Sequence, residues 1–165
     1  MDCYGIDVSL SHVPELDPDF IPLFRFNQAF LRDAHKPVSI ALERADGQMA
    51  VCDTFIHGTP DMEQADHYYV DRLVKTMLWM EGGFKIYVAG DEGVYQYLSR
   101  AYSAGGSRAF DWDYMANIFE RPFEVVFCDK VPQAKDDPKA MGGHLEGCRI
   151  GFDAGGSDRK VSAVI

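Results

Sequence analysis

The carboxyl-terminal stretch limits the possible folds of this chain more than any other part of it. Two apolar, β-prone runs, 150–153 and 159–165, flank the sequence Ala-Gly-Gly-Ser-Asp. Glycines between two such runs are typical of a tight β-hairpin. We therefore expect a hairpin over residues 150–165 with Gly155, Gly156 and Ser157 at its tip.

The residue types at this tip suit a phosphate group. Gly155 and Gly156 can take positive φ and have no Cβ, so successive backbone N–H groups can converge on an anion. Ser157 adds a hydroxyl donor, and Lys160 is a nearby cation. Asp153, at the end of the first run, can hold a hydrated Mg²⁺ that bridges nucleotide phosphates. The pattern predicts a phosphate site with Asp153 as the metal ligand, and the alternative is an ordinary glycine turn.

The segment 150–160 resembles the phosphate-binding hairpin, Asp-x-Gly-Gly-Ser/Thr, of the actin-like ATPase and sugar-kinase superfamily, and in particular that of the ROK family (repressors, open reading frames, sugar kinases). Asp153 and the Gly-Gly-Ser run match that motif position by position. Asp158 stands where ROK proteins usually have a lysine, and the basic pair Arg159-Lys160 follows it.

The resemblance implies a function and its cofactors. In that superfamily the hairpin begins an ATPase lobe, and the second phosphate loop and the sugar-side catalytic Asp come later. We therefore expect the chain to be the amino-terminal part of a ROK-like, ATP-dependent sugar kinase or sugar-responsive regulator. The parent would bind ATP, Mg²⁺ and a sugar, whereas this chain alone would be catalytically incomplete and would bind none of them tightly. The alternative is a non-enzymatic binding or assembly module in which the glycine hairpin is structural. A homo-oligomer is among the expected partners.

Charge and composition argue against several protein classes. The chain has 165 residues with a formal net charge of −10, whereas phosphate backbones are bound by excess Lys and Arg. No run approaches the roughly 20 apolar residues that span a bilayer. The four cysteines are far apart, which is typical of free thiols in a reducing cytoplasm. We therefore expect a cytoplasmic protein that contacts neither nucleic acid nor a membrane.

The sequence before the hairpin predicts an α/β domain over 1–128, with a mixed sheet and helices packed on it. Residues 129–147 combine prolines and glycines with polar residues and predict a linker, and 148–165 predict the truncated start of an actin-like ATPase lobe. The expected elements are a hairpin over 38–56, strands near 84–89 and 123–128, and helices over 20–34, 64–81 and 94–103.

Several acids stand at the expected helix starts. Asp19 is expected to cap the 20–34 helix, and Asp111 a short helix that runs to Phe119. Asp91 and Glu92 follow the 84–89 strand, and ligands of α/β sheets usually bind at the carboxyl ends of strands. The alternative is that these two acids favour the positive end of the next helix. The five histidines are scattered, so surface or capping roles are expected for them.

Overall fold

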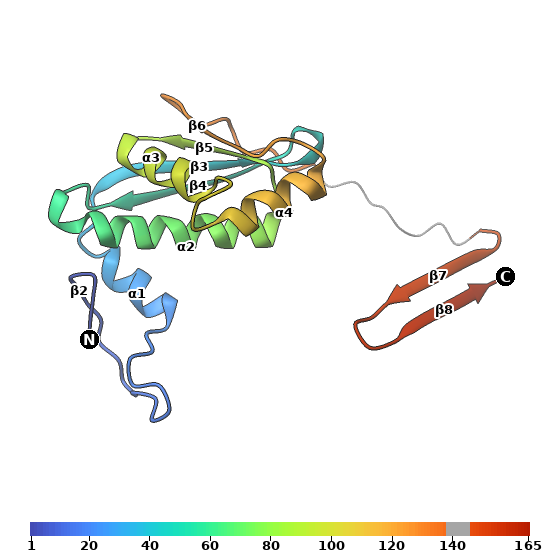
Figure 1. The fold of residues 1–165 in the computed structure, drawn as a ribbon, viewed down its shortest axis with the longest axis horizontal. Coiled ribbons are helices and arrows are strands. Elements are labelled where there is room, and N and C mark those ends of the chain that lie inside the picture. Colours follow the sequence, from blue (N-terminus) through green and yellow to red (C-terminus); the bar gives the residue numbers. More distant parts are fainter. Residues whose placement is uncertain (138–145) are drawn as a thin grey trace.

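The computed structural model describes residues 1–137 and 146–165. Within them, a four-stranded mixed sheet lies at the centre of the fold (Figure 1). β3 pairs antiparallel with β4 and β5, and β5 pairs parallel with β6. The expected α/β class is confirmed, together with the 38–56 hairpin. The strands in spatial order are β4 (Met49–Ile56), β3 (Lys36–Glu43), β5 (Lys85–Ala89) and β6 (Glu124–Phe127).

The core lies between this sheet and the helices that cover one of its faces. Alternate residues of β3, namely Val38, Ile40 and Leu42, are buried. The facing stripe of α2 (Glu63–Glu81) repeats every four residues with Val70, Val74 and Leu78. The apolar face of β3, which repeats every two residues, thus packs against the apolar stripe of α2, which repeats about every 3.6 residues. α3 (Glu92–Ala101) packs on β5 and β6, and α4 (Ala109–Phe119) follows it.

The amino-terminal segment differs from the expectation. β1 (Asp2–Cys3) and β2 (Ile6–Asp7) form a small hairpin, and α1 (Leu23–Phe30) lies beside β2. The prediction that Asp19 caps a 20–34 helix is wrong, because the cap position is Pro22 and it makes no side-chain cap bond. Proline disfavours helical backbone at the residue before it, so the helix cannot begin earlier.

Asp111 also has a role other than the expected cap. The cap position of α4 is Arg108, and Asp111 lies inside the first turn. Its buried carboxylate accepts a hydrogen bond from Trp79 Nε1 at 2.7 Å and one from Lys75 Nζ at 3.3 Å. Asp111 therefore ties α4 to α2 instead of capping α4.

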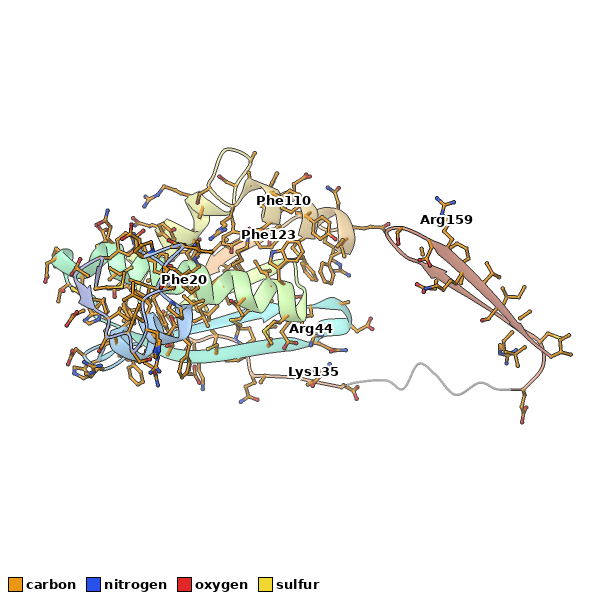
Figure 2. All side chains as sticks on the ribbon, turned by 90° about the horizontal axis from the view of Figure 1, so that it is seen from below. Phe20, Arg44, Phe110, Phe123, Lys135 and Arg159 are labelled. Atoms are coloured by element: carbon orange, nitrogen blue, oxygen red, sulfur yellow. The ribbon has the colours of Figure 1, made fainter. Side chains whose placement is uncertain are left out.

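After β6 the chain returns from one edge of the sheet to the other. Lys135 pairs with Met49 at the start of β4, with N–O distances of 2.8 and 3.0 Å between the two backbones (Figure 2). The first part of the expected 129–147 linker is therefore attached to the sheet. Residues 138–145 of that expected linker lie outside the described part of the chain.

The expected carboxyl-terminal hairpin is present as a sheet of its own, formed by β7 (Arg149–Ala154) and β8 (Arg159–Val164). Every residue of both strands is exposed. The strand alternation places Ile150, Phe152 and Val161 on one face, and Asp153 and Lys160 on the other. One face of the hairpin is thus mainly apolar, with Arg159 at its turn end, and solvent reaches that face.

Among the described helices, none combines the length and the apolar character that crossing a bilayer requires.

Candidate functional site

The hairpin brings together the residues that the motif singled out. Asp153 and Lys160 are directly paired in the register, one residue before the end of β7 and one after the start of β8. Gly155, Gly156 and Ser157 lie in the connecting turn. A carboxylate, a glycine turn with a hydroxyl and an ammonium therefore lie within a few residues of one another at an exposed tip.

The glycines of the turn adopt a different backbone from the expected one. Neither Gly155 nor Gly156 has positive φ. A Cβ added at Gly155 would lie 2.8 Å from Asp158 Oδ1, whereas one added at Gly156 would meet no atom within 4 Å. In this conformation Gly155 is needed for the close approach of Asp158, and Gly156 leaves its surroundings open.

Asp158 also controls the charge at the tip. Its Oδ2 lies 3.2 Å from Lys160 Nζ, and both side chains are more than half exposed. An exposed ion pair of this kind contributes only about 0–1 kcal/mol, so an incoming phosphate can compete for the lysine. The Asp158 carboxylate that remains would repel that phosphate.

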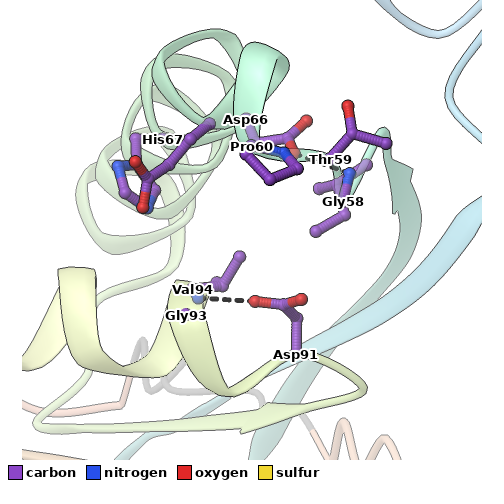
Figure 3. A pocket seen from close by; sticks show the side chains of 10 residues that line it. Gly58, Thr59, Pro60, Asp66, His67, Asp91, Gly93 and Val94 are labelled. Carbon is purple, nitrogen blue, oxygen red and sulfur yellow. Dashed lines mark hydrogen bonds between the residues drawn. The ribbon is translucent and has the colours of Figure 1, made fainter.

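A second candidate site is a pocket of about 270 Å³ between the start of α3 and the start of α2 (Figure 3). Figure 3 shows Asp91 and Val94 on one side, and Asp66, His67 and the 58–60 loop on the other. The pocket lies at the carboxyl end of β5, where the sequence places a ligand site as one alternative.

Asp91 caps α3, as the other alternative proposes. Its Oδ1 accepts a hydrogen bond from Val94 N at 2.8 Å, and its Oδ2 accepts one from Lys36 Nζ at 2.5 Å. Desolvation by burial raises the pKa of Asp91, but these hydrogen bonds and the lysine charge together bring its pKa below the ordinary value. Glu92 does not line this pocket, and its Oε1 accepts a hydrogen bond from Gln96 at 3.4 Å.

Asp66 holds the loop that forms the opposite wall. Its two carboxylate oxygens accept backbone hydrogen bonds from His57 N and Gly58 N, each at 2.8 Å. Asp66 is buried, and Gly58 has a φ of +71°, a conformation that glycine adopts without strain. The role of Asp66 has no signal in the sequence, because its partners precede it by eight and nine residues and lie outside its helix.

His67 supplies an imidazole to the wall of the pocket. Its ring stacks on Tyr97 with centroids 4.2 Å apart. Burial lowers the pKa of His67, which keeps the imidazole neutral at pH 7. Because Asp66 and Asp91 are already bonded, the side chains of Thr59, Glu63 and His67 remain to meet a small polar ligand. The described residues contain no group of three or more His, Cys, Asp or Glu side chains placed to hold a metal ion.

Comparisons with known proteins add no relative: no family model matches the chain, and no curated protein and no solved structure matches it significantly.

Proposed function

We propose that the chain is the amino-terminal part of a ROK-like, ATP-dependent sugar kinase or sugar-responsive regulator, and that the β7–β8 hairpin binds nucleotide phosphates. The observation that carries the proposal is the register of the hairpin, which pairs Asp153 with Lys160 beside the Gly-Gly-Ser turn. Asp153 would bind Mg²⁺ through its hydration shell, while Ser157, Lys160 and the turn amides would bind phosphate oxygens.

The amphipathic character of the hairpin supports a place at the start of a larger sheet. A two-stranded hairpin is marginally stable in water unless further strands or a helix cover its apolar face. Phe152 and Val161 are paired on that face and are 64% and 65% exposed. Under the proposal, further strands of an ATPase lobe cover this face and leave Asp153 and Lys160 directed to the ligand.

A test uses the longer protein in which this hairpin joins its lobe. Asp153→Asn should lower the rate of ATP-dependent sugar phosphorylation by on the order of 100-fold and leave the melting temperature unchanged, because an exposed metal carboxylate acts on transition-state charge. Asp137→Asn removes the same charge from another exposed position and serves as the matched control. For a regulator without kinase activity, calorimetric Mg²⁺-ATP affinity is the readout. An Asp153→Asn protein with unchanged turnover and unchanged Mg²⁺-ATP affinity would refute the proposal.

A specific surface favours the second candidate function, a binding or assembly module. The rings of Trp79, Phe110 and Tyr114 form an exposed parallel stack on α2 and α4, with centroid distances of 5.3–6.4 Å. Phe110 is 68% exposed, and exposed aromatic clusters of this kind are common at protein interfaces. Sedimentation equilibrium of the chain and of a Trp79→Ala/Phe110→Ala variant would test self-association through this surface.

A further inference from the structure

We propose that a groove between α1 and the segment after β2 is a second anion site, which binds a phosphomonoester. The groove has a volume of about 300 Å³ and lies at the amino-terminal end of the fold, on other elements than the β7–β8 hairpin. Its lining residues are Ser9, Leu10 and Ser11 from the segment, and Arg25, Gln28, Ala29 and Arg32 from α1 and the turn after it.

α1 and the turn after it contribute three long polar side chains to the lining of the groove. Arg25 and Gln28 are three residues apart, which is the spacing of one helical face, and Arg32 lies in the turn after α1. Both arginines line the same groove, so their guanidinium groups can approach one anion there. Arg25 Nη1 donates to Gln28 Oε1 at 3.3 Å, so the Gln28 amide still has its own N–H donors.

The charge of the groove contrasts with that of the chain. The protein has 26 acidic and 16 basic side chains, and Arg44 and Arg108 form ion pairs with carboxylates. Within residues 1–137 and 146–165, neither Arg25 nor Arg32 forms an ion pair. The lining of the groove contains no carboxylate. Two guanidinium groups therefore face the same groove without a counter-charge from its walls.

The donors define the class of ligand. Guanidinium groups bind phosphate oxygens through paired N–H donors. The hydroxyls of Ser9 and Ser11 add neutral donors from the segment after β2, and the Gln28 amide adds one from α1. Leu10 and the buried Ala29 supply apolar contact for the carbon part of an ester. A volume of about 300 Å³ is at the lower limit for small-molecule sites, which fits a small phosphorylated metabolite or a lipid phosphate headgroup.

Calorimetric titration of the chain tests the site, with inorganic phosphate and glucose 6-phosphate as soluble probes. Phosphatidylcholine vesicles with and without phosphatidic acid form the lipid arm. Arg25→Gln and Arg32→Gln should each weaken binding about tenfold or more, because each removes charge-assisted hydrogen bonds. Arg121→Gln changes the net charge equally at an exposed position elsewhere and should bind like the unchanged protein.

Backbone amide shifts locate the bound phosphate and separate this site from the hairpin. Shifts at Ser9, Ser11 and Gln28 that both arginine substitutions abolish would support the proposal. Binding only to phosphatidic acid vesicles, with the same loss in both variants, would support the site and assign it to a lipid headgroup. The proposal is overturned by absence of binding in both arms, by equal loss in Arg121→Gln, or by shifts confined to 153–160.

Discussion

Asp111 shows how a single buried carboxylate organises its surroundings. It accepts hydrogen bonds from Trp79 and Lys75, and an Nη1 atom of Arg108 lies 3.9 Å from its Oδ2. Arg108 also donates to both oxygens of Asp71, and the pKa of Arg108 is raised by that hydrogen bond, although burial opposes the shift. The network therefore links α2 to the start of α4 and sets the position of the Trp79 indole.

We expect Asp111→Ala to lower the free energy of unfolding by about 2 kcal/mol, because it removes the acceptor of Trp79 Nε1 and Lys75 Nζ, whereas Arg108 keeps Asp71 as its partner. Asp111→Asn keeps an acceptor for Trp79 and should cost less. The measurement is urea denaturation followed by Trp fluorescence and circular dichroism. Asp113→Ala, at an exposed position of the same helix, should change stability by less than about 0.5 kcal/mol. Equal losses in the Asp111→Ala and Asp113→Ala proteins would contradict the role assigned to the network.

At the scale of elements, the start of α3 depends on Asp91. The side chain both caps the helix and binds Lys36 from β3, so it joins two neighbouring elements. Because its folded-state pKa is depressed, the ionised carboxylate adds stability at neutral pH, and this contribution is lost as pH falls below about 4 and through the folded-state pKa.

Asp91→Ala should therefore destabilise the protein by about 1–2 kcal/mol at pH 7, as expected for a lost cap with an added ion pair. The difference between Asp91→Ala and the unchanged protein should shrink progressively below pH 4. Urea denaturation at several pH values measures it. A difference independent of pH down to pH 2 would show that the carboxylate charge has no part in it.

The turn of the β7–β8 hairpin gives a second prediction at this scale. Because Gly156 has no positive φ and open space around it, Gly156→Ala should leave the backbone conformation of the hairpin unchanged. Gly155→Ala should disturb it, since its new Cβ would lie 3.0 Å from the backbone oxygen of Asp158, which cannot rotate away as the carboxylate can. In the proposed parent, a loss of ATP affinity in Gly156→Ala would then mean that the new methyl group blocks the phosphate, because the hairpin backbone is unchanged. NMR spectra of the two variants check the conformational part.

On the scale of the whole molecule, we expect the β7–β8 hairpin to contribute little to the stability of the rest of the fold. All residues of β7 and β8 are exposed, whereas Lys135 is hydrogen-bonded to the edge of the central sheet. A chain of residues 1–137 should therefore unfold at the same urea concentration as the 165-residue chain. A chain of residues 1–128 should be less stable by about 1–2 kcal/mol, because it loses two backbone hydrogen bonds and the segment that carries them. A clearly lower unfolding concentration of urea for the 1–137 chain would contradict this, because it would show that the removed residues stabilise the rest of the fold.

The sequence by itself determined the turns, caps and helices whose determining residues lie close together along the chain. The Asp46-Gly47 turn has positive φ at both residues, as a tight hairpin requires, and α2 forms where the 64–81 helix is expected. Asp91 caps the helix that begins next to it. The β7–β8 hairpin formed as expected because its two strands adjoin its turn.

Tertiary structure decided the features whose partners are distant in sequence. Lys36 and Asp91 are 55 residues apart, Arg108 and Asp71 are 37 apart, and Lys135 returns to Met49 at the far edge of the sheet. A periodic pattern records which face of an element is apolar, but it does not record which side chains the packed elements bring together. The sequence by itself therefore supports the α/β class and the motif at the hairpin. The pocket beside Asp91 and the groove between Ser9 and Arg25 exist only because packing closes them.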